Sequence, residues 1–127
     1  MGPPRPKGES TMRYILMSYV DQSRVATLPP EQMQALMGRY ISFTQALAES
    51  GIMRGAEHLQ PVETATSVRN RDGESVLTDG PFADISEVFG GFWIIDVPDL
   101  DTALKHAADC PASDVGCTEV RPLVERG

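Results

Sequence analysis

Residues 92–107 read Phe-Trp-Ile-Ile-Asp-Val-Pro-Asp-Leu-Asp-Thr-Ala-Leu-Lys-His-Ala, and this segment changes from a strand pattern to a helix pattern. The largely apolar run 92–97 predicts a strand, which Pro98 ends because proline has no N–H to donate to a sheet. Asp99 is then well placed to cap a helix. The residues that follow form an apolar stripe at helical spacing: Leu100, Ala103, Leu104 and Ala107. A strand that leads directly into a one-sided helix indicates a helix packed on a sheet.

Upstream, residues 13–20 form a short, nearly all apolar run, which is typical of a central strand buried on both faces. A loop at residues 21–28 follows, and Pro29 and Pro30 then preset the backbone for the first turn of a helix. Gly51 ends this helix as its C-terminal cap. The apolar positions of the helix recur at helical spacing: Met33, Leu36, Met37, Tyr40, Phe43 and Leu47.

The remaining segments complete a sheet. Residues 52–59 and 118–123 each predict a strand, and the second helix ends near Cys110-Pro111. Residues 64–77 predict a β-hairpin, because Asp72-Gly73 is a strong signal for a two-residue turn. The order strand, helix, strand, hairpin, strand, helix, strand predicts an α+β fold. It is a ferredoxin-like βαββαβ arrangement with an extra β-hairpin, in which both helices cover one face of an antiparallel sheet.

The second face of this sheet is left without a helix. It would expose Tyr14, Met17, Trp93 or their neighbours unless another structure covers it. An identical sheet from a second subunit is the simplest cover, because one self-complementary surface then serves both chains. We therefore expect a homodimer.

Composition narrows the class of protein. A length of 127 residues suits one domain, and the formal charge of -7 opposes nonspecific binding to nucleic acid, which needs clustered Lys and Arg. No apolar run approaches the length that spans a bilayer. We therefore expect a soluble, cytoplasmic protein that binds neither nucleic acid nor membranes. Cys110 and Cys117 lack the spacing of a redox or zinc motif, so we expect free thiols.

The N-terminal segment differs in composition from the rest of the chain. Residues 1–11 are polar and rich in Pro and Gly, so we expect a disordered N-terminal extension or a remnant of expression. The single domain then spans residues 12–127.

Several segments carry a resemblance to a known family. They read Leu-Thr-Asp-Gly-Pro-Phe-Ala-Asp at 77–84, Gly-Gly-Phe at 90–92, Asp-Leu-Asp-Thr-Ala-Leu at 99–104 and Glu-Val-Arg-Pro at 119–122. Together they strongly resemble the DGPF branch of the YCII-related proteins over about residues 12–124. The resemblance implies a dimeric α/β-barrel of ferredoxin-like subunits with a cleft near the DGPF loop, residues 79–82. It does not imply one chemistry, because a fold does not determine a function.

Asp79 is the first candidate for the site, because Gly80 and Pro81 bend the chain sharply beside its carboxylate. The location of the family's cleft implies that Asp79 is a general base or a substrate anchor, with Phe82, Phe89 and Trp93 around it. The alternative is that Asp79 closes an Asx-type turn and satisfies the loop's own backbone.

Tyr40 and His58 are the other catalytic candidates. Some members of the wider family are proposed to use a His-Asp pair whose histidine lies on the first helix, eleven residues before the glycine that ends it; here that position is Tyr40. Tyrosine is a poorer base than histidine at neutral pH, so Tyr40 would act as a hydrogen-bonding acid or an orienting group. His58 is the candidate that titrates near neutral pH, or else a surface or interface histidine. Strand alternation directs Glu57 and His58 to opposite faces.

Arg69, Phe82 and Trp93 are candidates for substrate binding. Arg69 could hold an anionic group or form a cross-strand ion pair on an exposed hairpin. Trp93 could stack on a substrate or belong to the core or the dimer interface. We expect no metal and no cofactor, because the sequence has no ligand cluster, Gly-rich phosphate loop or nucleophile elbow.

Two functions fit these residues and the resemblance. The first is a small-molecule-binding, cofactor-independent enzyme of lyase-, dehydrochlorinase- or isomerase-like proton-transfer chemistry in secondary or degradative metabolism. In it Asp79 or His58 takes a proton and Tyr40 stabilises the oxyanion. The second is a noncatalytic ligand-binding or regulatory protein. It is implied by the frequent association of this branch with extracytoplasmic-function sigma factors, since an acidic dimer could contact a basic partner.

Overall fold

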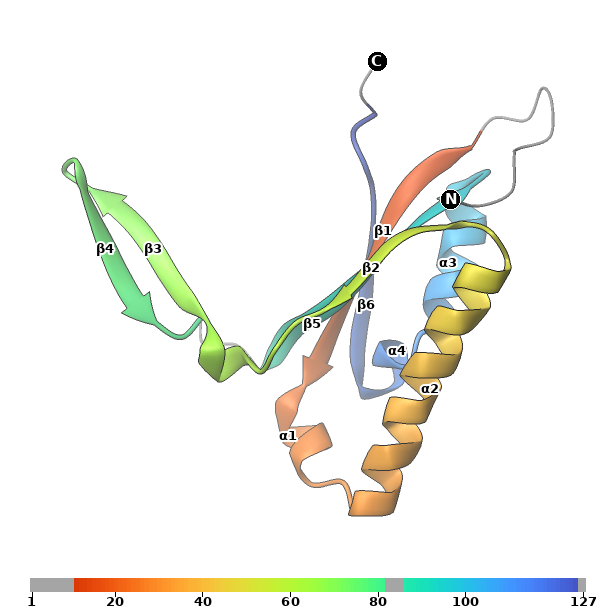
Figure 1. The fold of residues 1–127 in the computed structure, drawn as a ribbon, viewed down its shortest axis with the longest axis horizontal. Coiled ribbons are helices and arrows are strands. Elements are labelled where there is room, and N and C mark those ends of the chain that lie inside the picture. Colours follow the sequence, from red (N-terminus) through yellow and green to blue (C-terminus); the bar gives the residue numbers. More distant parts are fainter. Residues whose placement is uncertain (1–10, 82–85, 126–127) are drawn as a thin grey trace.

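The computed structural model describes residues 11–81 and 86–125, and its centre is a four-stranded antiparallel sheet with helices on one face (Figure 1). The strands lie in the order β2-β5-β1-β6. Their bounds are Met12–Asp21 for β1, Met53–His58 for β2, Glu87–Val97 for β5 and Gly116–Pro122 for β6. With the hairpin set aside, this arrangement is consistent with a ferredoxin-like fold. The predicted α+β class and antiparallel sheet are confirmed.

Four helices and one short 3-10 turn accompany the sheet in the described part of the chain. They are α1 (Gln22–Ala26), α2 (Pro30–Glu49), η1 (Val62–Thr64), α3 (Leu100–Asp109) and α4 (Ala112–Val115). The long helix α2 and helix α3 were both predicted, and each has the predicted boundary signal. Gly51 follows α2 with a φ of 79°. Asp99 accepts a hydrogen bond from the Thr102 N–H at 2.9 Å, which caps α3.

Two short helices were not predicted. Asp21 caps α1 by accepting from the Ser23 N–H at 3.0 Å, in the segment that we expected to be a loop. Helix α4 lies directly after Pro111, where we expected only a connection to the last strand. Both helices are too short to show an apolar period, and this explains why the sequence pattern missed them.

The two faces of the sheet differ in burial. Along β1, Tyr14, Leu16 and Ser18 are buried against the helices, whereas Ile15 and Met17 are half-buried on the opposite face. Within a single chain the expectation that this strand is buried on both faces is therefore wrong, because the helices cover one side only. We call the uncovered side the open face. Its apolar residues are Ile15, Met17, Tyr19, Phe89, Phe92 and Ile94.

The core lies between the sheet and helices α2 and α3. Trp93 pairs with Leu16 and Ile95 pairs with Tyr14, so both belong to the helix-facing side. Tyr14 and Trp93 were expected near the uncovered face, and this placement was wrong. Phe43 of α2 meets Trp93 edge to face with ring centroids 5.0 Å apart, an arrangement that aromatic pairs prefer.

The extra hairpin forms a separate two-stranded sheet of β3 (Thr66–Arg71) and β4 (Glu74–Asp79). Its turn has the two left-handed residues that a tight hairpin requires, with φ values of 52° at Asp72 and 80° at Gly73. Figure 1 shows the hairpin projecting away from α2 and α3, on the other side of the main sheet. We call residues 66–79 the arm.

In the structure Cys110 and Cys117 are free, with Cys110 buried and Cys117 exposed. Burial raises the pKa of the Cys110 thiol above its ordinary value, which lowers its reactivity. Within the described ranges, no helix combines the length and the apolar character that crossing a membrane requires.

Candidate functional site

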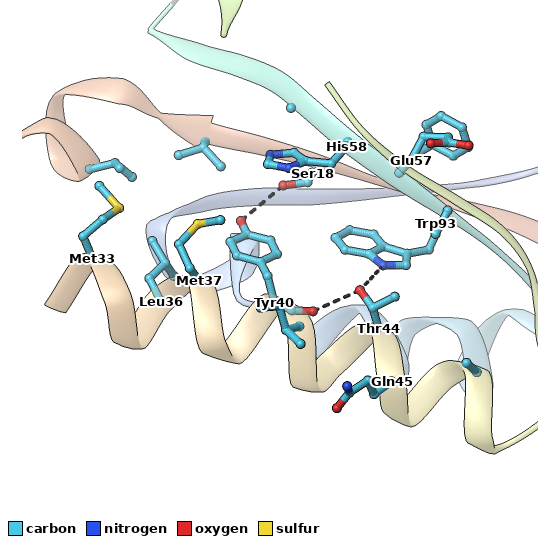
Figure 2. A pocket seen from close by; sticks show the side chains of 18 residues that line it. Ser18, Met33, Leu36, Met37, Tyr40, Thr44, Gln45, Glu57, His58 and Trp93 are labelled. Carbon is cyan, nitrogen blue, oxygen red and sulfur yellow. Dashed lines mark hydrogen bonds between the residues drawn. The ribbon is translucent and has the colours of Figure 1, made fainter. Parts of the chain in front are cut away.

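A pocket of about 600 Å³ lies between α2 and the helix-facing side of β1, β2 and β5. This volume lies within the range of small-molecule sites. Figure 2 shows the side chains around it, with α2 on one side and the strands on the other. Most of them are apolar, including Val20, Met33, Leu36, Met37, Ile41 and Ala56.

The polar groups of the pocket gather around Gly91. Ser18 of β1 and His58 of β2 both pair with Gly91 of β5, so they flank it on the helix-facing side. The Tyr40 hydroxyl approaches from α2 and lies 3.3 Å from the Ser18 hydroxyl, within hydrogen-bond distance. Figure 2 shows the His58 imidazole beside Ser18, facing the hydroxyl end of Tyr40. We call Ser18, Tyr40 and His58 the polar end of the pocket.

Gly91 is required for this arrangement. A β-carbon at this position would lie 2.8 Å from the Glu57 carbonyl oxygen, which is too close for a real contact. Because the clash is with backbone, it could be relieved only by moving β2 away from β5. Glycine therefore allows β2 to approach β5 closely enough to bring His58 to the pocket.

Tyr40 is held in a partly buried position with a defined protonation state. Burial raises the pKa of its hydroxyl above the ordinary tyrosine value, and the contact with Ser18 opposes this shift in part. The hydroxyl therefore stays protonated at neutral pH and can donate a hydrogen bond. Its ring lies parallel to that of Trp93, with an interplanar angle of 5° and centroids 6.2 Å apart.

A chain of hydrogen bonds fixes Trp93. Its indole N–H donates to the Thr44 hydroxyl at 2.9 Å, and that hydroxyl donates to the Tyr40 backbone carbonyl at 3.0 Å. The indole N–H is thus satisfied within the protein, which leaves the ring itself as the part of Trp93 that can face a ligand.

The charge of the pocket is low. Among the described lining residues there is no Lys or Arg, and the acidic residue Glu57 points to the opposite side of β2 from His58 (Figure 2). The described ranges also contain no group of three or more His, Cys, Asp and Glu that could hold a metal ion. The polar end thus offers a neutral phenol, a serine hydroxyl and an imidazole, which can polarise a carbonyl group and carry a proton.

The structure brings three of the six candidate residues together. Tyr40, His58 and Trp93 all line the pocket. Asp79 and Arg69 are exposed on the arm and do not line it. Phe82 lies outside the described residues.

The surroundings of Asp79 differ from those implied by the resemblance. Asp79 ends β4 opposite Thr66, and the Gly80 N–H donates to the Ala65 carbonyl at 2.7 Å, which closes the base of the arm. Phe89 lies on the open face, where its ring is 5.5 Å from that of Tyr19. Because Trp93 faces the helices, the two aromatic residues lie on opposite sides of β5.

Ser18 was not among the predicted site residues. It is a hydroxyl residue within the nearly all apolar run 13–20, and it shares the face of Tyr14 and Leu16. Alternation along the strand would have placed it on the buried face. A polar residue at a position predicted to be buried is therefore the signal that could have identified Ser18.

The comparisons with known proteins agree with the resemblance noted above. The family model of the YCII-related domain matches residues 12–126, a range that includes both the pocket and the arm. An uncharacterized protein of Rhizobium meliloti (strain 1021) is 32% identical over 114 residues, which cover 88% of this chain and 92% of that protein. The chain therefore belongs to the YCII-related family.

Proposed function

We propose that the pocket is the active site of a cofactor-independent enzyme that moves a proton on a small molecule. The observation that carries this proposal is the meeting of Tyr40, Ser18 and His58 at one end of a mostly apolar pocket. Lyase-like and isomerase-like reactions both fit, because each begins with the removal of a proton next to a carbonyl group. Such steps suit the secondary or degradative metabolism of organic compounds.

The roles follow from the chemistry of each group. The Tyr40 hydroxyl, kept protonated by burial, donates a hydrogen bond to the carbonyl oxygen and stabilises the negative charge that develops there. His58 removes the proton from the neighbouring carbon, and the electron pair of that C–H bond moves into the enolate. His58 then returns the proton to another carbon in an isomerisation, or the enolate expels a leaving group in an elimination.

The test starts from a ligand found by thermal shift against a metabolite library, since ligand binding raises the melting temperature by mass action. With that ligand as substrate, His58→Gln should lower kcat by about 10²- to 10⁴-fold, the usual contribution of a general base. Tyr40→Phe should lower kcat by about 10²- to 10³-fold, because it removes one oxyanion donor.

Asp79→Asn is the matched control, because Asp79 is exposed on the arm and does not line the pocket. It should retain the activity of the wild type. Full turnover in folded His58→Gln and Tyr40→Phe would contradict the assignment. A large loss in Asp79→Asn instead would return the site to the DGPF loop.

The proposal includes a homodimer in the cytoplasm. Support for the dimer comes from the open face, where Ile15, Met17 and Ile94 are half-buried and Phe89 is 37% exposed. A second copy would bury these side chains. Burial of exposed apolar surface favours association of the two copies. The free thiols Cys110 and Cys117 are consistent with a reducing compartment.

A further inference from the structure

We propose that the substrates of this pocket are flat, aromatic compounds without a phosphate or several carboxylates, whose carbonyl oxygen binds at the polar end. The inference rests on the pocket of the proposed function and specifies what the pocket selects. Three features of the lining carry it: its charge, its shape and the position of its polar end.

Apart from the His58 imidazole, the described lining offers no side chain that can carry a positive charge for a phosphate. Among the described residues around the pocket there is no Lys or Arg, the side chains that recognise phosphate and carboxylate groups. Arg39 precedes Tyr40 on α2, but its guanidinium donates to the Asp114 carboxylate at 2.6 Å, outside the pocket. A polyanionic metabolite would lose its hydration without gaining a counter-charge.

The start of α2 does not replace the missing cations. A helix N-terminus binds anions through free N–H groups, but Pro29 at the cap and Pro30 at the first helical position have none. Glu31 in the first turn adds a negative charge there. The chain as a whole also carries a formal charge of -7, which disfavours polyanions further.

The walls of the pocket suit a flat ring. The Tyr40 and Trp93 rings are parallel within 5° and lie beside one another along the pocket (Figure 2). On the sheet side, Gly90 and Gly91 have no side chains, so the backbone of β5 is open to a ligand at the register shift opposite Ser18 and Tyr19. Met33 and Met37 approach from α2, and thioether side chains adapt their shape and make favourable contacts with aromatic rings.

The polar end can bind one oxygen atom of a ligand. The Tyr40 hydroxyl and the Ser18 hydroxyl lie 3.3 Å apart, with the His58 imidazole beside Ser18. A ligand oxygen placed there can accept from Tyr40, whereas a pure hydrocarbon would leave the Tyr40 and Ser18 hydroxyls bonded only to each other and would cover the imidazole. Ser18 is buried and Tyr40 is half-buried, and a site built around such groups disfavours ligands that cannot pair with them.

Trp93 makes a direct test possible, because it is the single tryptophan of the chain and it lines the pocket. We would follow quenching of its fluorescence by 4-methylumbelliferone and by 4-methylumbelliferyl phosphate, which share one ring system and differ by the phosphate. The phenol should bind at least about tenfold more tightly than the phosphate ester, which has no lysine or arginine partner among the described lining residues. Tyr40→Phe should weaken binding of the phenol by several-fold.

Shape is tested by competition against 4-methylumbelliferone. The planar aromatic competitor 2-naphthol should displace it more effectively than its saturated analogue decahydro-2-naphthol. Charge is tested by Met37→Arg, which places a cation at the pocket and should raise the affinity for the phosphate ester. Ala35→Arg is the matched control on another side of α2, outside this pocket, and should leave both affinities unchanged.

Tighter binding of the phosphate ester by the wild type would overturn the inference, as would the absence of quenching by the aromatic probes. Equal displacement by the flat and the saturated competitor would also overturn it. These outcomes are separate from the test of catalysis. Full turnover in His58→Gln would contradict the proposed reaction, while the preference for flat aromatic ligands would still hold.

Discussion

Gly91 is the residue on which the geometry of the polar end depends, because it pairs with both Ser18 and His58. We expect Gly91→Ala to destabilise the protein by about 1–3 kcal/mol, since the added carbon is forced against backbone. The same change should displace His58 and weaken ligand binding. Urea denaturation measures the free energy of unfolding of the variant.

Gly90→Ala is the control, because a β-carbon there meets nothing within 4 Å. It should be neutral or slightly stabilising. Equal stability of the two variants would show that the close approach of β2 and β5 is not required.

The sequence identified some residues of the candidate site and missed others. Tyr40 and His58 were identified as candidates, and both reach the pocket. The proximity of Tyr40 and His58 could not be predicted. It depends on the strand register, which places His58 and Ser18 on either side of Gly91. The resemblance directed attention to Asp79, whose position depends on how the arm leaves the sheet. Local sequence carries little information about that direction.

Among the elements, α3 gives the clearest test of a predicted boundary. Asp99 accepts hydrogen bonds from the Thr102 N–H at 2.9 Å and from the Thr102 hydroxyl at 2.7 Å. These bonds hold the pKa of the Asp99 carboxyl below its ordinary value. A lowered pKa means that the cap contributes stability above the pKa of the unfolded chain and loses it as pH falls through the folded pKa.

We therefore expect Asp99→Ala to lower the melting temperature by a few degrees at neutral pH. The difference from the wild type should shrink as the pH falls into the acidic range. Asp109→Ala, at the other end of the same helix, is the control and should not reproduce this pH dependence. A difference that stays constant with pH would contradict the capping role.

Elements with strong local signals were predicted well. Prolines at the start of α2, Gly51 after it and Asp99 before α3 each act within a few residues, so the sequence contains the whole cause. Strand β5 begins at Glu87, earlier than predicted, because Gly90 and Gly91 lie inside it. The pairing of β5 with β1 and β2 outweighs the weak strand preference of glycine there.

At the scale of the whole molecule, the order of elements predicted the sheet and the side on which the helices lie. The faces of particular residues were less predictable. Tyr14 and Trp93 are aromatic residues that could lie on either side, and only the pairing with Ile95 and Leu16 decides this. A homodimer stays a prediction. It now rests on the open face, whose apolar residues include Ile15, Met17 and Ile94.

Dimerisation through the open face should have a measurable effect on the arm. Within the described residues β3 and β4 pair only with each other, and an isolated two-stranded hairpin is marginally stable in water. Val68 and Leu77 form a cross-strand pair and are 59% and 68% exposed. Because the arm projects on the side of the sheet away from α2 and α3 (Figure 1), a second copy on the open face would lie next to it.

We expect Met17→Asp, which places a charge on the open face, to convert a dimer into a folded monomer by light scattering. Amide hydrogens of residues 66–79 should then exchange faster than in the wild type, because the arm loses its neighbour. Leu104 was predicted to belong to the stripe of α3 that packs on the sheet, but it is 45% exposed, so Leu104→Asp should change neither property. A monomeric wild type would contradict the dimer. Equal exchange of the arm in a dimeric wild type and in monomeric Met17→Asp would show that the arm is stable without the second copy.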